Sequence, residues 1–290
     1  MADPIQLELP SAGGVTLAAY RWEPAGDPRA VARLAHGMGE HARRYQHLAE
    51  ALTDEGYVVY AQDHRGHGAT AGSEAELGQV GAEGWDELVA DIGRLGDLAR
   101  EAYPGLPHAL VAHSMGSFAA QQWLLDHSDE VDAVVLSGTA GIDLLEPSLD
   151  LDVPLDLSAF NAPFEPARTD FDWLSRDEQQ VDRYVEDPWC GFGLDPAAGR
   201  QMFVGARRLA DPDAVAGIRD DLSVLVSVGE KDPVNGGLAL VEPLLLRLQG
   251  AGLTDVTLRT WPDARHEIFN ETNREEVVGD VVAWLRERVG

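Results

Sequence analysis

The sequence predicts an α/β protein in which helices cover both faces of a mostly parallel central sheet. Three observations predict this fold. Short apolar β-rich runs alternate with segments of helical spacing through the first 140 residues. The alternation then stops for a long stretch, and it resumes before the C-terminus. Alternation of this kind is typical of parallel strands joined by crossover helices, so the interrupting stretch is expected to be an insertion.

The elements before the interruption follow in order. Strands are expected at residues 15–22, 30–35, 57–61, 108–112 and 131–136. Helices are expected at residues 42–54, 85–100 and 114–125. The first helix stops at Gly56, a residue suited to a helix C-terminus. The second has Leu88, Ile92, Leu95 and Leu98 at helical spacing.

The interruption separates the strand that ends near Leu136 from the next strand, which starts at Leu222. The 85 residues between them far exceed the dozen or so that a crossover needs. The segment is rich in proline and acid and has its own helix candidate at 177–186. We therefore expect a core of residues 1–140 and 214–290 and a cap of residues 141–213. The cap is expected over the carboxyl edge of the sheet, where open α/β sheets bind ligands.

The last part of the chain completes the pattern. Strands are expected at residues 222–228 and 256–260, and helices at 238–248 and 274–288.

The charge and composition exclude several classes of protein. Against 50 acidic residues stand 22 basic ones, a formal net charge of −28. Nucleic acids and anionic membrane surfaces would be repelled. The single cysteine, Cys190, excludes an internal disulfide. No signal peptide or membrane-spanning run is visible, so a cytoplasmic protein is expected.

The strongest chemical signal is Ser114, in the run Ala112–His113–Ser114–Met115–Gly116. It lies between an apolar strand and a helix of small residues. A serine at such a junction stands on a tight turn with its hydroxyl above the sheet edge, as nucleophiles do. The simpler interpretation is a serine that caps the helix. The small neighbours Ala112 and Gly116 favour the nucleophile, although alanine replaces the usual first glycine.

A serine needs a base and an orienting carboxylate before it can attack. His266 follows the final strand, and Asp232 follows the strand that ends at Val228. Both are therefore expected at the same sheet edge as Ser114. Alternatively, Asp232 starts an Asp-Pro turn and His266 is a surface histidine. The order serine, aspartate, histidine favours the catalytic interpretation.

An oxyanion needs two N–H donors. The glycine-rich loop His36–Gly37–Met38–Gly39–Glu40 ends an early strand. It is expected to supply the backbone N–H of Met38, with Met115 as the second donor. A plain flexible turn is the alternative.

Three further features are less specific. The histidines of Asp63–His64–Arg65–Gly66–His67–Gly68 lack structural-zinc spacing, so no metal is predicted and a turn beside the site is expected. Cys190 is expected to be a small buried apolar residue. Aromatic residues of the insert suit an acyl-chain tunnel, although a core for the cap is the default; they are Phe160, Phe164, Phe171, Trp173, Trp189 and Phe192.

Taken together, these motifs resemble the monoacylglycerol lipase and lysophospholipase group of the α/β-hydrolases. The resemblance includes His41 and the Trp173–Asp177 segment of the insert, and it covers nearly the whole chain. It implies the α/β-hydrolase fold, with Ser114 as nucleophile, Asp232 as acid and His266 as base. It also implies that Glu40 and Arg44 face the glycerol end of the substrate.

The predicted function is hydrolysis of the carboxylic ester of a monoacylglycerol-like neutral lipid through an acyl-enzyme. No cofactor is needed. Alternatives are a lysophospholipase, a short-to-medium-chain carboxylesterase, a peptidase on the same scaffold, or a non-catalytic binding protein. The expected partner is a small lipid ester, with transient contact to a lipid surface through the cap and without stable membrane insertion. The oligomeric state is left open.

Overall fold

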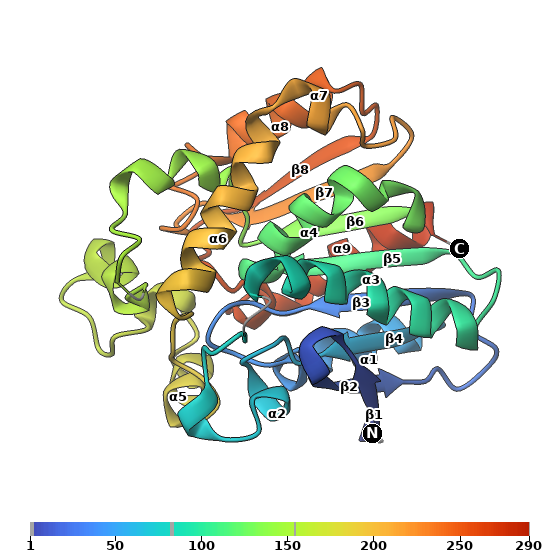
Figure 1. Cartoon of the computed structure of the whole chain (residues 1–290), viewed down its shortest axis with the longest axis horizontal. Coiled ribbons are helices and arrows are strands. Elements are labelled where there is room, and N and C mark those ends of the chain that lie inside the picture. Colours follow the sequence, from blue (N-terminus) through green and yellow to red (C-terminus); the bar gives the residue numbers. More distant parts are fainter. Residues whose placement is uncertain (1–2, 82–83, 154, 290) are drawn as a thin grey trace.

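The computed structural model describes residues 3–81, 84–153 and 155–289. Within these residues one sheet of eight strands has the order β1-β2-β4-β3-β5-β6-β7-β8, spread from bottom to top in Figure 1. The strands are β1 (Ile5–Pro10), β2 (Thr16–Trp22), β3 (Ala30–Ala35), β4 (Tyr57–Gln62), β5 (His108–His113), β6 (Ala133–Ser137), β7 (Ser223–Gly229) and β8 (Val256–Trp261). Only the pairs β1–β2 and β2–β4 are antiparallel. The predicted α/β fold is confirmed.

The α-helices of the described residues are α1 (Gln46–Asp54), α2 (Gly68–Ala71), α3 (Gly84–Ala102), α4 (Met115–His127), α5 (Glu178–Glu186), α6 (Pro196–Ala206), α7 (Pro212–Val215), α8 (Val241–Gly250) and α9 (Arg274–Arg288). The helix expected from residue 42 begins instead as the 3-10 turn Ala42–Tyr45, and α1 follows it. Strand β1 and helices α2, α6 and α7 were not expected from the sequence.

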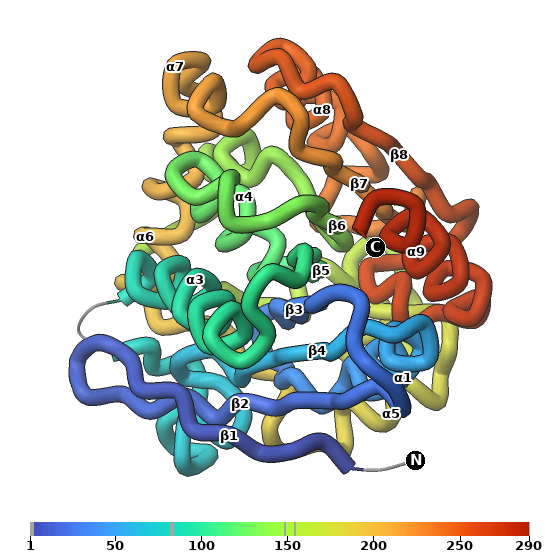
Figure 2. The backbone as a smooth tube through the Cα atoms, turned by 90° about the vertical axis from the view of Figure 1, so that its right-hand side faces the viewer, coloured from blue at the N-terminus to red at the C-terminus, as the bar shows by residue number. Residues whose placement is uncertain are grey.

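Helices cover both faces of the sheet, as Figure 2 shows: α1 and α9 lie on one side, and α3, α4 and α6 on the other. The core follows the two-residue period of the strands. In β5, Leu110 and Ala112 pack in the cluster beneath α3 and α4. Ala109 and Val111, which alternate with them, pack beneath α1 and α9. Burial on both faces explains why the central strands are continuously apolar.

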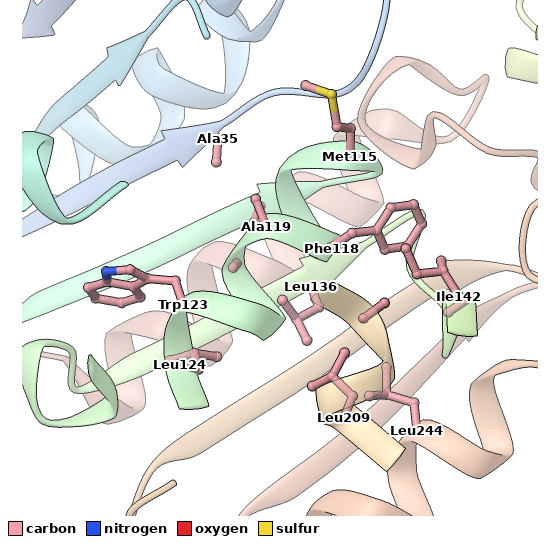
Figure 3. Packing of buried hydrophobic residues seen from close by; sticks show 14 of the residues in the cluster. Ala35, Met115, Phe118, Ala119, Trp123, Leu124, Leu136, Ile142, Leu209 and Leu244 are labelled. Atoms are coloured by element: carbon pink, nitrogen blue, oxygen red, sulfur yellow. The ribbon is translucent and has the colours of Figure 1, made fainter. Parts of the chain in front are cut away.

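Helix α4 runs through the interior, and every residue from Met115 to Leu125 is buried. Figure 3 shows its side chains Met115, Phe118 and Ala119 among Leu136, Ile142 and other apolar groups. The helix lies so close to β3 that a Cβ on Gly116 would be 2.4 Å from the Ala35 carbonyl oxygen. A glycine is therefore required at this position, and the close packing fixes the start of α4.

The segment between β6 and β7 lies at the end of the sheet where the parallel strands terminate, on the left in Figure 1. It consists of α5, α6, α7 and 3-10 turns at Ile142–Leu144, Glu146–Ser148, Leu157–Phe164, Asp172–Leu174 and Arg207–Ala210. Asp177 caps α5 by accepting the N–H groups of Gln179 and Gln180. Helix α6 packs on α3 and α4. In the part of the chain described, no helix combines the length and apolar character needed to cross a bilayer.

Candidate active site

Ser114 stands at the junction of β5 and α4 in a strained backbone conformation, with φ 50° and ψ −122°. Left-handed φ values are rare outside glycine and are tolerated where the surrounding structure enforces them. The Ser114 N–H donates to the Ser137 carbonyl at 2.9 Å, which holds the turn against β6. The Ser114 hydroxyl makes no capping bond to α4. The simpler interpretation of a capping serine is therefore wrong.

His266 and Asp232 meet at the ends of two neighbouring strands. The Nδ1 of His266 lies 3.0 Å from Oδ2 of Asp232. Because a carboxylate only accepts, Nδ1 donates and Nε2 is left without the proton. The second oxygen, Oδ1, accepts the N–H of Val234 at 2.9 Å, so Asp232 also forms the Asp-Pro turn that was its alternative interpretation. His266 is 2% exposed, which excludes a surface histidine.

Burial lowers the pKa of His266, but the charge of Asp232 and the hydrogen bond to it outweigh that effect. Glu267 and Glu40 add to it, so the pKa of His266 lies above its usual value. His113, whose ring centroid is 4.8 Å from that of His266, has a pKa far below the usual value because it is buried. Of these two neighbouring imidazoles, only His266 is placed to gain a proton.

Ser114 and His266 line one narrow cavity of about 60 Å³. Within the described residues, no hydrogen bond joins the Ser114 hydroxyl to the His266 ring. In unliganded enzymes such contacts are often long and shorten when substrate binds. The structure thus brings the three predicted residues to one edge of the sheet, with the His266–Asp232 bond formed.

Met38 and Met115 line the same cavity. Across the described segments, neither backbone N–H has a protein acceptor. The two loops that carry these donors lie against each other, because a Cβ on Gly37 would be 3.1 Å from the Ser114 Cβ. Two unpaired N–H groups beside a serine hydroxyl can bind an oxyanion.

Side chains behind the loop hold it in place. Glu40 accepts the Gly37 N–H at 2.5 Å and the Tyr45 hydroxyl at 2.7 Å. The Asp63–Gly68 turn lies beside the site, as expected: the His64 N–H donates to Nε2 of His36 at 2.9 Å. Asp63 in turn accepts the backbone N–H of Ala42 at 2.9 Å.

Arg44 joins two carboxylates in the wall of the site. It donates to Glu40 at 2.6 Å and to both oxygens of Glu267 at 2.6 and 2.7 Å. Glu40 and Glu267 line the cavity, whereas Arg44 lies behind them. Burial lowers the pKa of Arg44, but the two carboxylates raise it well above its usual value.

The two carboxylates differ in their affinity for a proton. Burial raises the pKa of Glu40 despite the charge of Arg44. Burial also acts on Glu267, but the charge of Arg44 and its two hydrogen bonds outweigh it, so the Glu267 pKa lies below its usual value. Glu267 therefore stays ionised, and Glu40 is the first of the pair to take up a proton.

The remaining wall is apolar. It is formed by α4 and above all by the segment between β6 and β7, including its helix α6, with residues Phe118, Ile142, Leu145, Leu149, Leu155, Leu157, Phe160, Met202 and Phe203. Of the six aromatic residues singled out from the sequence, only Phe160 and Trp173 line this cavity. Phe171 packs on Tyr184 and Phe192 on His67. Some of these aromatic residues therefore line the cavity, and others pack within the segment between β6 and β7 or against its neighbours.

The buried histidines beside the site are uncharged. Burial lowers the pKa of His64 to about 4 and that of His67 to about 3. A separate trio, His41, Asp187 and Cys190, has potential ligand atoms within 4.8 Å of one another. His41 and Asp187 are already joined at 2.9 Å. Cys190 is half-buried and packs against the apolar core, so it is less buried than expected.

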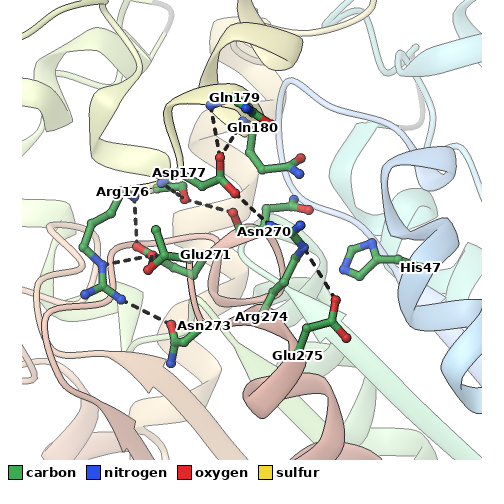
Figure 4. Close-up of polar contacts among 12 residues, drawn as sticks. His47, Arg176, Asp177, Gln179, Gln180, Asn270, Glu271, Asn273, Arg274 and Glu275 are labelled. Carbon is green, nitrogen blue, oxygen red and sulfur yellow. Dashed lines mark hydrogen bonds and ion pairs between the residues drawn. The ribbon is translucent and has the colours of Figure 1, made fainter.

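Two buried carboxylates near His266 have partners that are far away in the chain. Glu267 directly follows His266, and its partner Arg44 lies 223 residues away in the chain. Glu271 is fully buried and binds Arg176 from the segment between β6 and β7, as Figure 4 shows. Arg44 lies four residues after Glu40, and this short separation is the one local sign of the first network.

Lys231, the only lysine of the chain, directly precedes Asp232. Its side chain is exposed, while its backbone N–H donates to the Ala264 carbonyl at 2.9 Å. This bond ties the loop after β7 to the loop after β8.

Known proteins are similar to this chain over nearly its whole length. The monoacylglycerol lipase of Mycolicibacterium smegmatis is 34% identical over 278 residues, with 94% of each chain covered. Among solved structures, a highly thermostable carboxyl esterase from Bacillus coagulans, in complex with glycerol, gives a TM-score of 0.87 at 25% identity over 100% of both chains. The monoacylglycerol lipase of Paleococcus ferrophilus gives 0.70 at 25% identity, covering 93% of this chain and 98% of that chain.

The fold and these relatives define the chain as a carboxylic ester hydrolase with the α/β-hydrolase fold. Its resemblance to the monoacylglycerol lipase group, stated from the motifs, is confirmed. The chain belongs to the family described as serine aminopeptidase, S33, whose model matches residues 26–273.

Proposed function

We propose that this protein hydrolyses the carboxylic ester of a monoacylglycerol through an acyl-enzyme on Ser114. One observation carries the proposal: a strained serine without a capping bond shares a cavity with a histidine whose Nδ1 is held by a buried aspartate. The names of the relatives support the substrate class.

The reaction follows from this geometry. His266 Nε2 takes the proton of the Ser114 hydroxyl as the oxygen attacks the ester carbonyl carbon. The N–H groups of Met38 and Met115 stabilise the oxyanion. When the carbon–oxygen bond of the ester breaks, His266 returns the proton to the leaving alcohol. Water, activated by the same histidine, then releases the fatty acid and regenerates Ser114.

The two walls of the cavity favour a neutral lipid. The apolar wall from the segment between β6 and β7 suits an acyl chain, and the wall with Glu40 and Glu267 suits the hydroxyls of an alcohol. Two carboxylates face a single guanidinium there. An anionic head group would meet this negative wall unpaired, which is costly in a buried site. A neutral glycerol avoids that cost.

Residues 141–213 would act as the cap over a core of residues 1–140 and 214–290. Supporting this, most of the apolar lining comes from that segment. The cavity of about 60 Å³ holds only a few water molecules, so a long acyl chain requires cap side chains to move apart. Exposed apolar residues of the segment, Leu144, Val153, Val185 and Val204, support transient contact with a lipid surface. A cytoplasmic location stays a prediction.

The alternative is a short-to-medium-chain carboxylesterase, which the narrow cavity favours. Rates on monoacylglycerols, p-nitrophenyl esters and lysophosphatidylcholines of matched chain lengths separate the candidates. The proposal expects the highest kcat/KM on a monoacylglycerol and little hydrolysis of the lysophospholipid. A preference for acetyl or butyl esters over every monoacylglycerol would favour the carboxylesterase.

Ser114→Ala tests the nucleophile. The variant should fold as the wild type does, lose ester hydrolysis and resist labelling by a fluorophosphonate probe. Ser73→Ala, at an exposed serine, is the matched control and should keep full activity. Unchanged hydrolysis by Ser114→Ala would exclude the proposed role.

A further inference from the structure

One stretch of the cap runs along the loop that carries His266. We call residues 172–177 the anchor strip and residues 262–273, between β8 and α9, the base loop. The Glu267 N–H donates to the Leu174 carbonyl at 2.8 Å, and the His266 N–H donates to the Trp173 carbonyl at 3.4 Å. The Trp173 ring also lies against the His266 ring, with centroids 4.9 Å apart. The anchor strip thus contacts His266 both through backbone hydrogen bonds and through the Trp173 side chain.

Glu271 binds both the anchor strip and the base loop. Its Oε1 accepts the N–H of Arg176 at 3.0 Å and that of Arg265 at 2.9 Å. Its Oε2 accepts Nε of Arg176 at 2.9 Å and the Thr272 N–H at 2.8 Å. Both oxygens are therefore fully used, and the side chain is 0% exposed. Figure 4 shows Glu271 facing Arg176.

These contacts hold both sides of His266. Arg265, the residue before it, is bound to Glu271. Glu267, the residue after it, is bound to the strip, and the strip returns to Glu271 through Arg176. These hydrogen bonds form a closed ring around His266, so the histidine can change its position only if one of them breaks.

A second set of contacts keeps the strip from moving with the rest of the cap. Ser175 Oγ donates to the Asn270 carbonyl at 2.9 Å, and Arg274 donates to Asp177 at 2.7 Å. Asp177 in turn caps α5, as Figure 4 shows. At the other end of the strip, Arg265 donates to the Asp172 carbonyl, so the anchor strip is bound to the core at both of its ends.

We propose that Glu271 is a positioning residue for the reaction, which holds His266 in its working orientation by binding the base loop to the anchor strip of the cap. Glu271 does not line the cavity and acts only through the residues it binds. The proposal rests on the proposed function of His266 as the base. It also divides the cap into a fixed strip and the remaining segments, which alone move to admit substrate.

Glu271→Gln tests the proposal. The substitution replaces one carboxylate oxygen by an NH2 group, which cannot accept hydrogen bonds from the N–H donors that the oxygen bound. A small displacement of a catalytic group can cost about 10²-fold in rate. We expect kcat to fall about 10- to 100-fold with KM nearly unchanged, and fluorophosphonate labelling of Ser114 to slow in parallel. The acid limb of the kcat/KM profile should move to lower pH, because His266 no longer keeps its full contact with Asp232.

Glu275→Gln is the matched control. It removes the same charge four residues away, at a side chain that is 95% exposed, and should leave rate, labelling and pH profile unchanged. Urea unfolding of each variant gives the folded fraction, so that rates refer to folded enzyme. A Glu271→Gln enzyme that is only less stable, with wild-type kcat and pH profile, would overturn the proposal.

Arg176→Met gives an independent test if Glu271→Gln does not fold. Its side chain is 31% exposed, and its loss leaves the backbone donors of Glu271 in place. We expect a smaller loss of kcat, about 3- to 10-fold, and a pH shift in the same direction. Folded Arg176→Met with wild-type kinetics would refute the role of the strip. Failure of the wild type itself to hydrolyse esters or to label at Ser114 would instead reject the proposed function.

Discussion

Arg44 donates two parallel hydrogen bonds to Glu267, Nη1 to Oε1 at 2.6 Å and Nη2 to Oε2 at 2.7 Å. Because Arg44 also binds Glu40, it connects the loop after β3 with the loop after β8. The first of these loops carries the Met38 N–H and the second carries His266. The two halves of the proposed site are thus joined by one guanidinium.

Removal of this guanidinium should be costly. Arg44→Met leaves Glu40 and Glu267 buried without their cation, and breaking a buried pair costs about 3–5 kcal/mol. We expect the free energy of unfolding in urea to fall by that amount near pH 7. Arg43→Met, at a neighbouring side chain that is 45% exposed, should change it by less than about 0.5 kcal/mol. Equal effects of the two substitutions would contradict the assigned role.

The rate should depend on pH through His266. The base works in its neutral form, and its pKa is raised, so kcat/KM should fall on the acid side with a midpoint above about 6.5. Asp232→Asn removes the charge that raises this pKa. It should move the midpoint down and lower kcat by about 10⁴-fold. Asp263→Asn, an exposed position in the base loop, serves as the control and should preserve both values.

Gly116 should not tolerate a side chain. In Gly116→Ala the new Cβ would be 2.4 Å from the Ala35 carbonyl and 2.5 Å from that of His36, so α4 must move and shift Ser114 with it. We expect the free energy of unfolding to fall by about 1–3 kcal/mol and kcat/KM to drop at least about 10-fold. Gly199→Ala, where nothing lies within 4 Å, should be neutral or slightly stabilising.

His64 should make the protein sensitive to acid. Its pKa is about 4 in the folded state and about 6.5 in the unfolded chain. Between these values the unfolded state binds more protons, so stability falls as the pH drops through that window. His64→Leu should reduce the slope of unfolding free energy against pH by up to about 1.4 kcal/mol per pH unit. Measurements at pH 8, above the pKa of His64 in both the folded and the unfolded state, give the effect on packing alone.

Much of the fold was predictable because the central strands are buried on both faces and stand out as apolar runs. Strand β1 was missed although Ile5, Leu7 and Leu9 alternate, since most of its residues are exposed at the sheet edge. Helix α6 was missed although Asp195 and Pro196 form a standard helix start, in which Asp195 accepts two N–H groups.

The positions of Ser114, Asp232 and His266 were predictable because parallel strands end at one edge of a sheet. The bonds that support them were not. Glu271 and Arg176 are 95 residues apart, and no local pattern indicates that they meet. The same holds for Arg44 and Glu267. Ion pairs across such separations depend on how loops from distant parts of the chain lie against one another, which neither periodicity nor spacing specifies.

The exposed amine of Lys231 has a practical consequence. Activated esters acylate amines without any enzyme, and apart from the chain's α-amine this protein offers them one nitrogen of that kind. In mass spectra of the digested protein, an acyl mass on the peptide around Ser114 reports the acyl-enzyme, and one on the peptide around Lys231 reports acylation without catalysis. Acylation of Lys231 therefore serves as an internal control for acylation of Ser114 in the same sample.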